Sequence, residues 1–140
     1  MDILDFKAAS RCYFMDMGLA SYHLKMIGTN NGTLAGTLSE NYVYINLVKR
    51  QDFPSEIIFE TPAFATYKGG EIDFVAQTPE SQIRYLIEIK AGKDTAPTAL
   101  KALKDGKADH LLYLKGNARY GVEGKIITLP IYLLEKFQFQ

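Results

Sequence analysis

Cysteine and histidine are scarce in this sequence of 140 residues. Cys12 is the single cysteine, which excludes an internal disulfide framework, and His23 and His110 are the two histidines. These three side chains argue against a closed zinc site of nitrogen and sulfur ligands. Two histidines also leave few candidates for the base of a Ser-His-Asp triad.

An excess of charge of one sign is also lacking, because sixteen basic residues balance sixteen acidic ones. Nucleic-acid binding would therefore require a local basic patch. The sequence has no run of about 18 apolar residues, so no membrane span is expected. Its N-terminal MDILDFKAAS lacks the basic head and apolar core of a signal peptide. We expect a cytoplasmic protein with no membrane contact.

The sequence contains no G-x-x-x-x-G-K-[ST] loop, so we expect no P-loop ATPase domain in this chain. Its length is that of one domain, and a composition of 47% hydrophobic and 23% charged residues is typical of a globular protein. We therefore expect residues 1–140 to form a single domain.

Helix and strand patterns alternate along the chain, which favours an α/β fold with helices packed on a mixed sheet. A long helix is predicted from about Thr33 or Thr37 to Lys49, after a loop at 28–33. A second helix is predicted over 94–107, with Asp94 or Thr95 near its cap. The remaining predictions are strands at 57–67, 71–77, 83–90, 110–115 and 125–129, and a closing helix at 130–137.

Strands 71–77 and 83–90 flank a short polar turn and predict a hairpin. Side chains alternate along a strand, so each strand has two faces. The apolar face carries Ile72, Phe74, Ala76, Ile83, Tyr85, Ile87 and Ile89. Val75 and Leu86 lie on the other, polar face, which indicates that this face is partly covered as well.

A turn centred between residues 80 and 81 sets two carboxylates against each other. The predicted pairs are Glu71 with Lys90, Asp73 with Glu88, and Val75 with Leu86. Facing like charges are destabilising. The polar face could be simply solvated, with Lys90 as the neutralising charge. Partial cover instead favours a shared proton or a cation, and Mg²⁺ prefers oxygen ligands of this kind. Lys90 could then orient a metal-activated water or stabilise a pentacovalent phosphate.

The segments GEIDFV and YLIEIKAG resemble the Asp…Glu-x-Lys core of the PD-(D/E)xK nuclease superfamily. The resemblance implies a restriction-endonuclease-like α/β fold, with a mixed central sheet flanked by helices. It implies that Asp73, Glu88 and Lys90 are catalytic and that the carboxylates bind Mg²⁺ or Mn²⁺. It adds Glu40 and the backbone carbonyl of Ile89 as further metal ligands.

A wider resemblance covers nearly the whole chain. The segments RCYFMDMGLASYHL, LAGTLSENYVYINL, ATYKGGEIDFV, YLIEIKAGK and ITLPIYLLEKF are similar to one family. This is the uncharacterised C-terminal domain family of bacterial and archaeal AAA-type ATPases, which is similar in fold to PD-(D/E)xK nucleases. The resemblance implies an AAA-type ATPase domain as a partner.

Glu40 has two interpretations. Thr37-Leu38-Ser39-Glu40 fits a capping box if the helix begins near Leu38. If the helix begins near Leu34, Glu40 lies inside it and could reach the metal.

Lys93, Lys101, Lys104 and Lys107 follow the Glu-x-Lys motif and could form a patch that binds nucleic acid. A lysine-rich helix face is more often plain solvated surface, so both interpretations stay open. The leading hypothesis is a Mg²⁺-dependent phosphodiesterase acting on DNA or RNA. The alternative is a catalytically silent module that binds nucleic acid, the ATPase or another partner.

Overall fold

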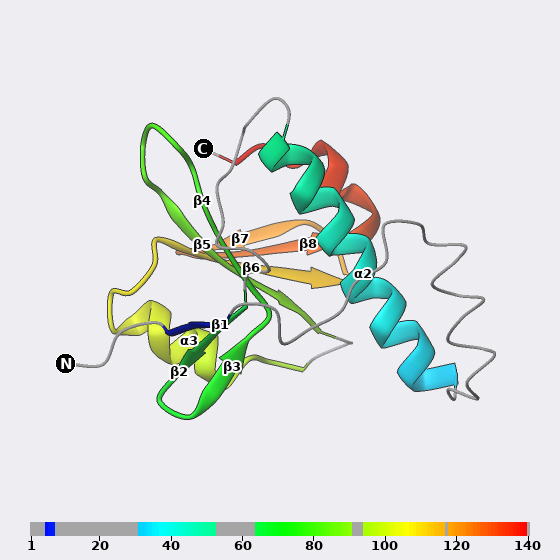
Figure 1. The fold of residues 1–140 in the computed structure, drawn as a ribbon, viewed down its shortest axis with the longest axis horizontal. Coiled ribbons are helices and arrows are strands. Elements are labelled where there is room, and N and C mark those ends of the chain that lie inside the picture. The colour runs from blue at the N-terminus through cyan, green and yellow to red at the C-terminus, as the bar shows by residue number, and fades with distance from the viewer. Residues whose placement is uncertain (1–4, 8–30, 53–63, 91–93, 117, 140) are drawn as a thin grey trace.

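A five-stranded mixed sheet lies at the centre of the fold (Figure 1). The computed structural model describes residues 5–7, 31–52, 64–90, 94–116 and 118–139. The sheet has the order β4-β5-β6-β8-β7, with β5, β6 and β8 parallel and the edge strands β4 and β7 antiparallel to their neighbours. The strands are β4 (Phe74–Gln77), β5 (Arg84–Ile89), β6 (His110–Lys115), β7 (Gly121–Glu123) and β8 (Ile126–Pro130). The predicted α/β class with a mixed sheet is confirmed.

A second, antiparallel sheet has the order β1-β2-β3 and consists of β1 (Asp5–Lys7), β2 (Phe64–Tyr67) and β3 (Gly70–Ile72). The predicted strand 71–77 is therefore two strands, β3 and β4, which belong to different sheets (Figure 1). Asp73 is the one residue between them. Ile72 packs with the buried residues of one layer and Phe74 with those of the other, so the predicted common face of these two residues is wrong.

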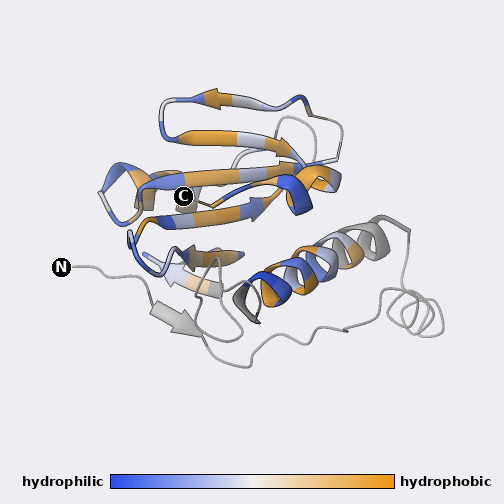
Figure 2. Ribbon diagram, turned by 90° about the horizontal axis from the view of Figure 1, so that it is seen from above, coloured by the Kyte–Doolittle hydropathy of each residue, from blue (hydrophilic) through white to orange (hydrophobic). Residues whose placement is uncertain are grey.

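Helices cover both faces of the central sheet. Helix α2 (Asn31–Asp52) and the 3₁₀ helix η1 (Ile131–Lys136) pack on one face, and α3 (Pro97–Lys104) packs on the other. Strands buried on both sides are apolar along their length, as the orange strands in Figure 2 show. The first layer buries Val43, Leu47, Phe74, Ile87, Leu112 and Leu134, and the second buries Val75, Leu86, Ala99, Ala102 and Leu111.

The helix boundaries differ from the predicted ones. α2 begins at Asn31, so residues 31–33 are helical and not loop. α3 is shorter than the predicted helix at 94–107, and its N-cap is Ala96, directly after Asp94 and Thr95, which were expected near the cap. The Ala96 N–H donates to the Tyr113 hydroxyl at 3.0 Å, a tertiary partner that replaces a local cap. The closing helix is a 3₁₀ helix.

Strands β1 and β7, which are three residues long each, were not predicted from the sequence. Lys93, the first part of strand 57–67 and residues 28–30 of the predicted loop lie outside the described residues. Within the described segments, no helix is both long enough and apolar enough to cross a membrane.

Sheet and helix approach closely at Gly70, the first residue of β3. A Cβ atom added there would lie 1.9 Å from Oγ1 of Thr98 in α3. We expect Gly70→Ala to lower the free energy of unfolding by about 1–3 kcal/mol, because backbone or helix must shift to accept the methyl group. Gly116→Ala is the matched control, since its Cβ would meet open space. Equal urea midpoints for the two variants would contradict this packing.

Candidate functional site

Asp73 and Glu88 are brought together by the register of the β4-β5 hairpin. Val75 pairs with Leu86, as predicted, and the same register sets Asp73 opposite Glu88. The ladder ends at Phe74, one residue after Asp73. The predicted pairing of Glu71 with Lys90 is wrong, because Glu71 pairs with Thr66 of β2 in the second sheet. The carboxyl pair therefore lies where the two sheets separate.

Hydrogen bonds hold Asp73 against the end of β5. Its Oδ2 accepts the Ile89 N–H at 3.0 Å, and its carboxyl group also shares a hydrogen bond with that of Glu88. Glu88 is 2% exposed, yet its Oε1 has no hydrogen-bond partner among the described residues. A buried acceptor without a partner is costly. The site thus offers a buried oxygen that a ligand could satisfy.

The electrostatics of the pair follow from burial. The pKa of Glu88 is raised to about 9, first because the carboxyl is buried and second because Asp73 is close. The charge of Lys90 acts in the opposite direction and lowers this pKa. Glu88 is therefore protonated at neutral pH, as expected for two carboxyl groups that face each other without a cation.

The pair lies at the carboxyl ends of the parallel strands. Glu88 is next to last in β5, and its register partner in β6 is Tyr113, which in turn pairs with Thr128 of β8. Lys90 follows β5 directly, and its N–H donates to the Leu114 carbonyl at 3.1 Å. Ligands of open α/β sheets bind outside these strand ends. The position of the carboxyl pair therefore favours a binding or catalytic site.

Glu40 lies inside α2 and is half-buried. The capping-box interpretation is wrong, because the helix begins at Asn31, well before Thr37. In the described part of the chain, no group of three or more His, Cys, Asp or Glu side chains is placed to hold a metal ion. The structure thus brings together Asp73 and Glu88 as a pair, and the role of Glu40 as a third ligand stays a prediction.

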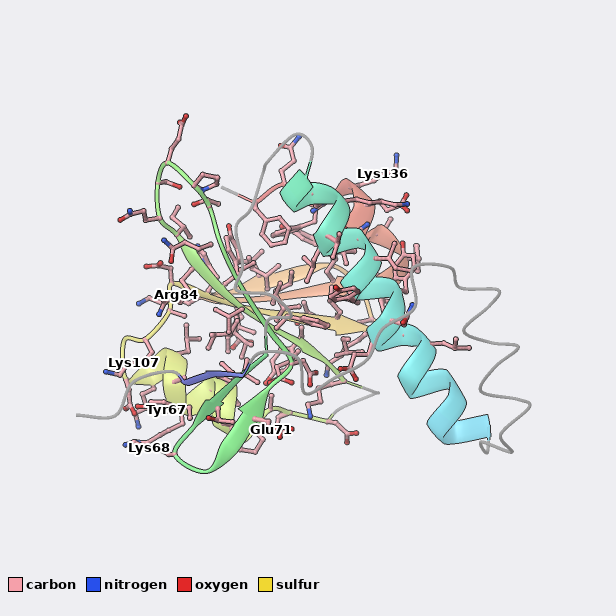
Figure 3. All side chains as sticks on the ribbon, in the orientation of Figure 1. Tyr67, Lys68, Glu71, Arg84, Lys107 and Lys136 are labelled. Carbon is pink, nitrogen blue, oxygen red and sulfur yellow. The ribbon has the colours of Figure 1, made fainter. Side chains whose placement is uncertain are left out.

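The predicted lysine patch is partly described. Lys101 and Lys104 lie in the last turn of α3 and are exposed, whereas Lys93 lies outside the described residues. Lys101 Nζ is 3.4 Å from an oxygen of Asp105, and Lys68 Nζ is 3.6 Å from the other. Figure 3 shows Lys68 on the β2-β3 turn beside α3. Lys68 and Lys101 therefore both lie against an acidic residue, Asp105.

Tyr67 and Lys68 join this surface, and the sequence analysis missed them. The Tyr67 hydroxyl donates to Asp105 at 2.6 Å, and this bond is the main reason why the pKa of Asp105 is lowered. The only signal in the sequence is the turn Lys68-Gly69-Gly70, which shows a hairpin but not the helix on which it packs.

Comparison with known protein families gives one match. A family model described as a domain of unknown function, DUF4143, matches residues 35–134. The matched segment includes Glu40, Asp73, Glu88 and Lys90. No curated protein and no solved structure matches the chain significantly.

Proposed function

Because the chain belongs to the DUF4143 family, whose function is unknown, we propose a function from the site: a nuclease-like domain that hydrolyses phosphodiester bonds of nucleic acid with Mg²⁺ or Mn²⁺. The observation that carries this proposal is the buried carboxyl group of Glu88 facing the half-buried one of Asp73, beside Lys90 at the carboxyl ends of parallel strands.

The donor set fits a hard divalent cation. Asp73 and Glu88 supply carboxylate oxygens, which Mg²⁺ and Mn²⁺ prefer, and Mg²⁺ usually takes only one or two carboxylates from a protein. The Glu88 Oε1 atom is buried and has no hydrogen-bond partner among the residues described, so a ligand there would remove an energetic cost. Glu40 and the Ile89 carbonyl are proposed as additional ligands by resemblance to PD-(D/E)xK nucleases.

Each residue of the site has a separate task in the proposed reaction. A bound Mg²⁺ or Mn²⁺ supplies Lewis-acid stabilisation of phosphoryl oxygens and a more acidic water. The Ile89 N–H fixes the orientation of the Asp73 carboxylate through its 3.0 Å hydrogen bond. Glu88 would give its proton to solvent and offer its carboxylate to the cation, and the Lys90 ammonium would stabilise negative charge that develops on the phosphate.

The proposal includes a fold relationship and partners. We propose that the central sheet and its helices are a restriction-endonuclease-like core, and that the domain acts with an AAA-type ATPase. Lys93, Lys101 and Lys104 are the proposed contacts to the nucleic-acid backbone. Phosphate contacts of this kind confer affinity without sequence specificity.

Thermal melts and cleavage assays on the wild-type protein test this function. A ligand that binds only the folded state stabilises it, by about 2.7 kcal/mol at a concentration a hundredfold above the dissociation constant. We expect Mn²⁺ and Mg²⁺ to raise the melting temperature relative to EDTA, and labelled DNA or RNA to be cleaved only with metal. Unchanged melts and intact substrates would refute the proposal.

A catalytically silent module that binds nucleic acid or a partner is the second candidate. The chain has no net charge, and Asp105 offsets the lysines of the α3 surface through contacts of 3.4 and 3.6 Å. These observations weaken the case for tight binding of a polyanionic substrate. Metal-dependent stabilisation without cleavage of either substrate would favour this alternative.

Glu40→Gln tests the proposed third ligand. Since Glu40 lies well inside α2, we expect no loss of a helix cap and a nearly unchanged melting temperature in EDTA. If Glu40 is a ligand, the affinity for Mn²⁺ in isothermal titration calorimetry should fall about tenfold or more. A pure loss of stability, with metal affinity unchanged, would assign Glu40 a structural role.

A further inference from the structure

A second lysine, Lys115, lies beside Lys90 at the edge of the site. The parallel register pairs Ile89 with Leu114, and the hydrogen bond from the Lys90 N–H to the Leu114 carbonyl continues the ladder. The next pair in this register is Lys90 and Lys115, on strands about 4.8 Å apart. The two lysines therefore emerge next to each other from the carboxyl ends of β5 and β6.

Both lysines lie on the face that carries the carboxyl pair. Alternation along β5 places Lys90 on the face of Glu88, and alternation along β6 places Lys115 on the face of Tyr113. Glu88 and Tyr113 are register partners on neighbouring strands, so these two faces are one surface. Lys115 thus lies on the strand next to that of Glu88, two residues beyond Tyr113, the register partner of Glu88.

The Lys115 side chain is held in position by its surroundings. Its Nζ donates to the Asp94 carbonyl at 3.1 Å and lies 5.3 Å from the centroid of the Tyr113 ring. Tyr113 is buried, and its hydroxyl accepts the Ala96 N–H at 3.0 Å, which fixes the ring against the start of α3. A cation ordered in this way loses little further conformational entropy when a ligand binds.

Lys90 and Lys115 are backbone neighbours in the parallel register, and ammonium groups brought together from these positions repel each other unless an anion lies between them. A phosphodiester has two non-bridging oxygens that share one negative charge, and they could accept hydrogen bonds from both lysines. We propose that Lys115 is a substrate-binding residue, which together with Lys90 holds the phosphodiester group of a nucleic acid over the carboxyl pair. This inference rests on the proposed nuclease-like function and adds a residue that the Asp…Glu-x-Lys pattern does not contain.

Lys115→Met removes the positive charge and keeps an unbranched side chain. The matched control is Lys125→Met, because Lys125 is exposed and directly precedes β8, at the opposite end of the parallel strands. The probes are fluorescein-labelled DNA and RNA oligonucleotides, single-stranded and duplex, in EDTA, and binding is measured by fluorescence anisotropy at several salt concentrations.

We expect Lys115→Met to weaken binding about five- to tenfold at low salt and to reduce the salt slope for a duplex by about 0.9, the value for one phosphate contact. Lys115→Arg should restore the affinity, and Lys125→Met should change it less than twofold. The oligonucleotide that loses more affinity in Lys115→Met identifies whether DNA or RNA is the preferred source of the phosphodiester. With a cleaved substrate, Lys115→Met should raise KM more than it lowers kcat.

Melts with Mn²⁺ separate this inference from the proposed function. A normal metal response in Lys115→Met, together with weaker oligonucleotide binding, supports both. Weaker binding in a protein that shows no metal response overturns the metal site and leaves the phosphate contact standing. Equal affinities for wild type and Lys115→Met, or equal losses in Lys115→Met and Lys125→Met, overturn the inference, as does a wild-type protein that binds neither DNA nor RNA. A lower melting temperature in Lys115→Met with unchanged affinity assigns Lys115 the structural task of holding the Asp94 carbonyl.

Discussion

Asp73→Asn should abolish the stabilisation by Mn²⁺ and lower metal-dependent cleavage about a hundredfold or more, the range found when one group that stabilises the charge of a transition state is removed. Asparagine keeps a carbonyl oxygen that can accept the Ile89 N–H, so the bend between β3 and β4 should persist. What the variant lacks is the negative charge that binds the cation. The experiment therefore separates the charge of Asp73 from its structural hydrogen bond.

The behaviour of Asp73→Asn without metal is the internal control. In EDTA the variant should be as stable as the wild type at neutral pH, because Glu88 is protonated there and the pair does not repel. Near pH 9, where wild-type Glu88 ionises, the variant should be more stable, since it lacks the opposing charge. A clear loss of stability in EDTA, with no effect of metal on either protein, would mean that Asp73 and Glu88 form a structural network.

Lys90→Ala provides the complementary result. It keeps both carboxyl groups, so Mn²⁺ should still raise the melting temperature, while cleavage should fall about a hundredfold. Lys90 is assigned to the phosphate and the water. If Lys90→Ala no longer responded to metal, this assignment would be contradicted, because Lys90 would then be needed for metal binding.

Glu88→Gln should remove most of the pH dependence of stability in EDTA. The folded-state pKa of Glu88, about 9, lies above its ordinary value of 4.5. The folded protein therefore binds more protons than the unfolded chain between these values, and the free energy of unfolding falls as pH rises. The contribution of Glu88 is fully present below about pH 4.5 and is lost above about pH 9.

Glutamine has nearly the same shape as glutamate and does not titrate, so the free energy of unfolding of Glu88→Gln should not fall in this way as the pH rises. At pH 9 the variant should exceed the wild type by several kcal/mol, on the order of 5 from the difference between the two pKa values. Urea unfolding at pH 5, 7 and 9 measures the difference between the two proteins. Parallel profiles would show that Glu88 is already ionised in the folded protein.

The same proton links metal binding to pH. A cation needs the ionised form of Glu88, so metal binding must release a proton at neutral pH. The affinity of the wild type for Mn²⁺ should therefore increase about tenfold for each unit by which the pH is raised, up to about pH 9. An affinity that does not change with pH would exclude Glu88 as a metal ligand.

Part of the hairpin register could be predicted from the sequence. An assumed turn centre between residues 80 and 81 pairs Val75 with Leu86, as the structure has it, and places Asp73 opposite Glu88. The apolar side chains on both strands agree with this register, and a slip of one residue would break the agreement. The third predicted pair, Glu71 with Lys90, was wrong because β3 belongs to the other sheet. A continuous apolar run likewise indicated β6, because a strand that is buried on both faces is apolar along its length. The helical period of α2 was also visible, although its start was not.

The properties of the site depend on contacts that no local pattern reveals. Ile72 and Phe74 are both apolar, so the sequence gives no sign that the chain changes sheets at Asp73. The raised pKa of Glu88 depends first on its burial, which arises from tertiary packing and not from the local pattern of β5. Lys115 is the neighbour of Lys90 only because β5 and β6 are parallel. Alternation is a local property of one strand, whereas burial and parallel neighbours arise from contacts between segments far apart along the chain.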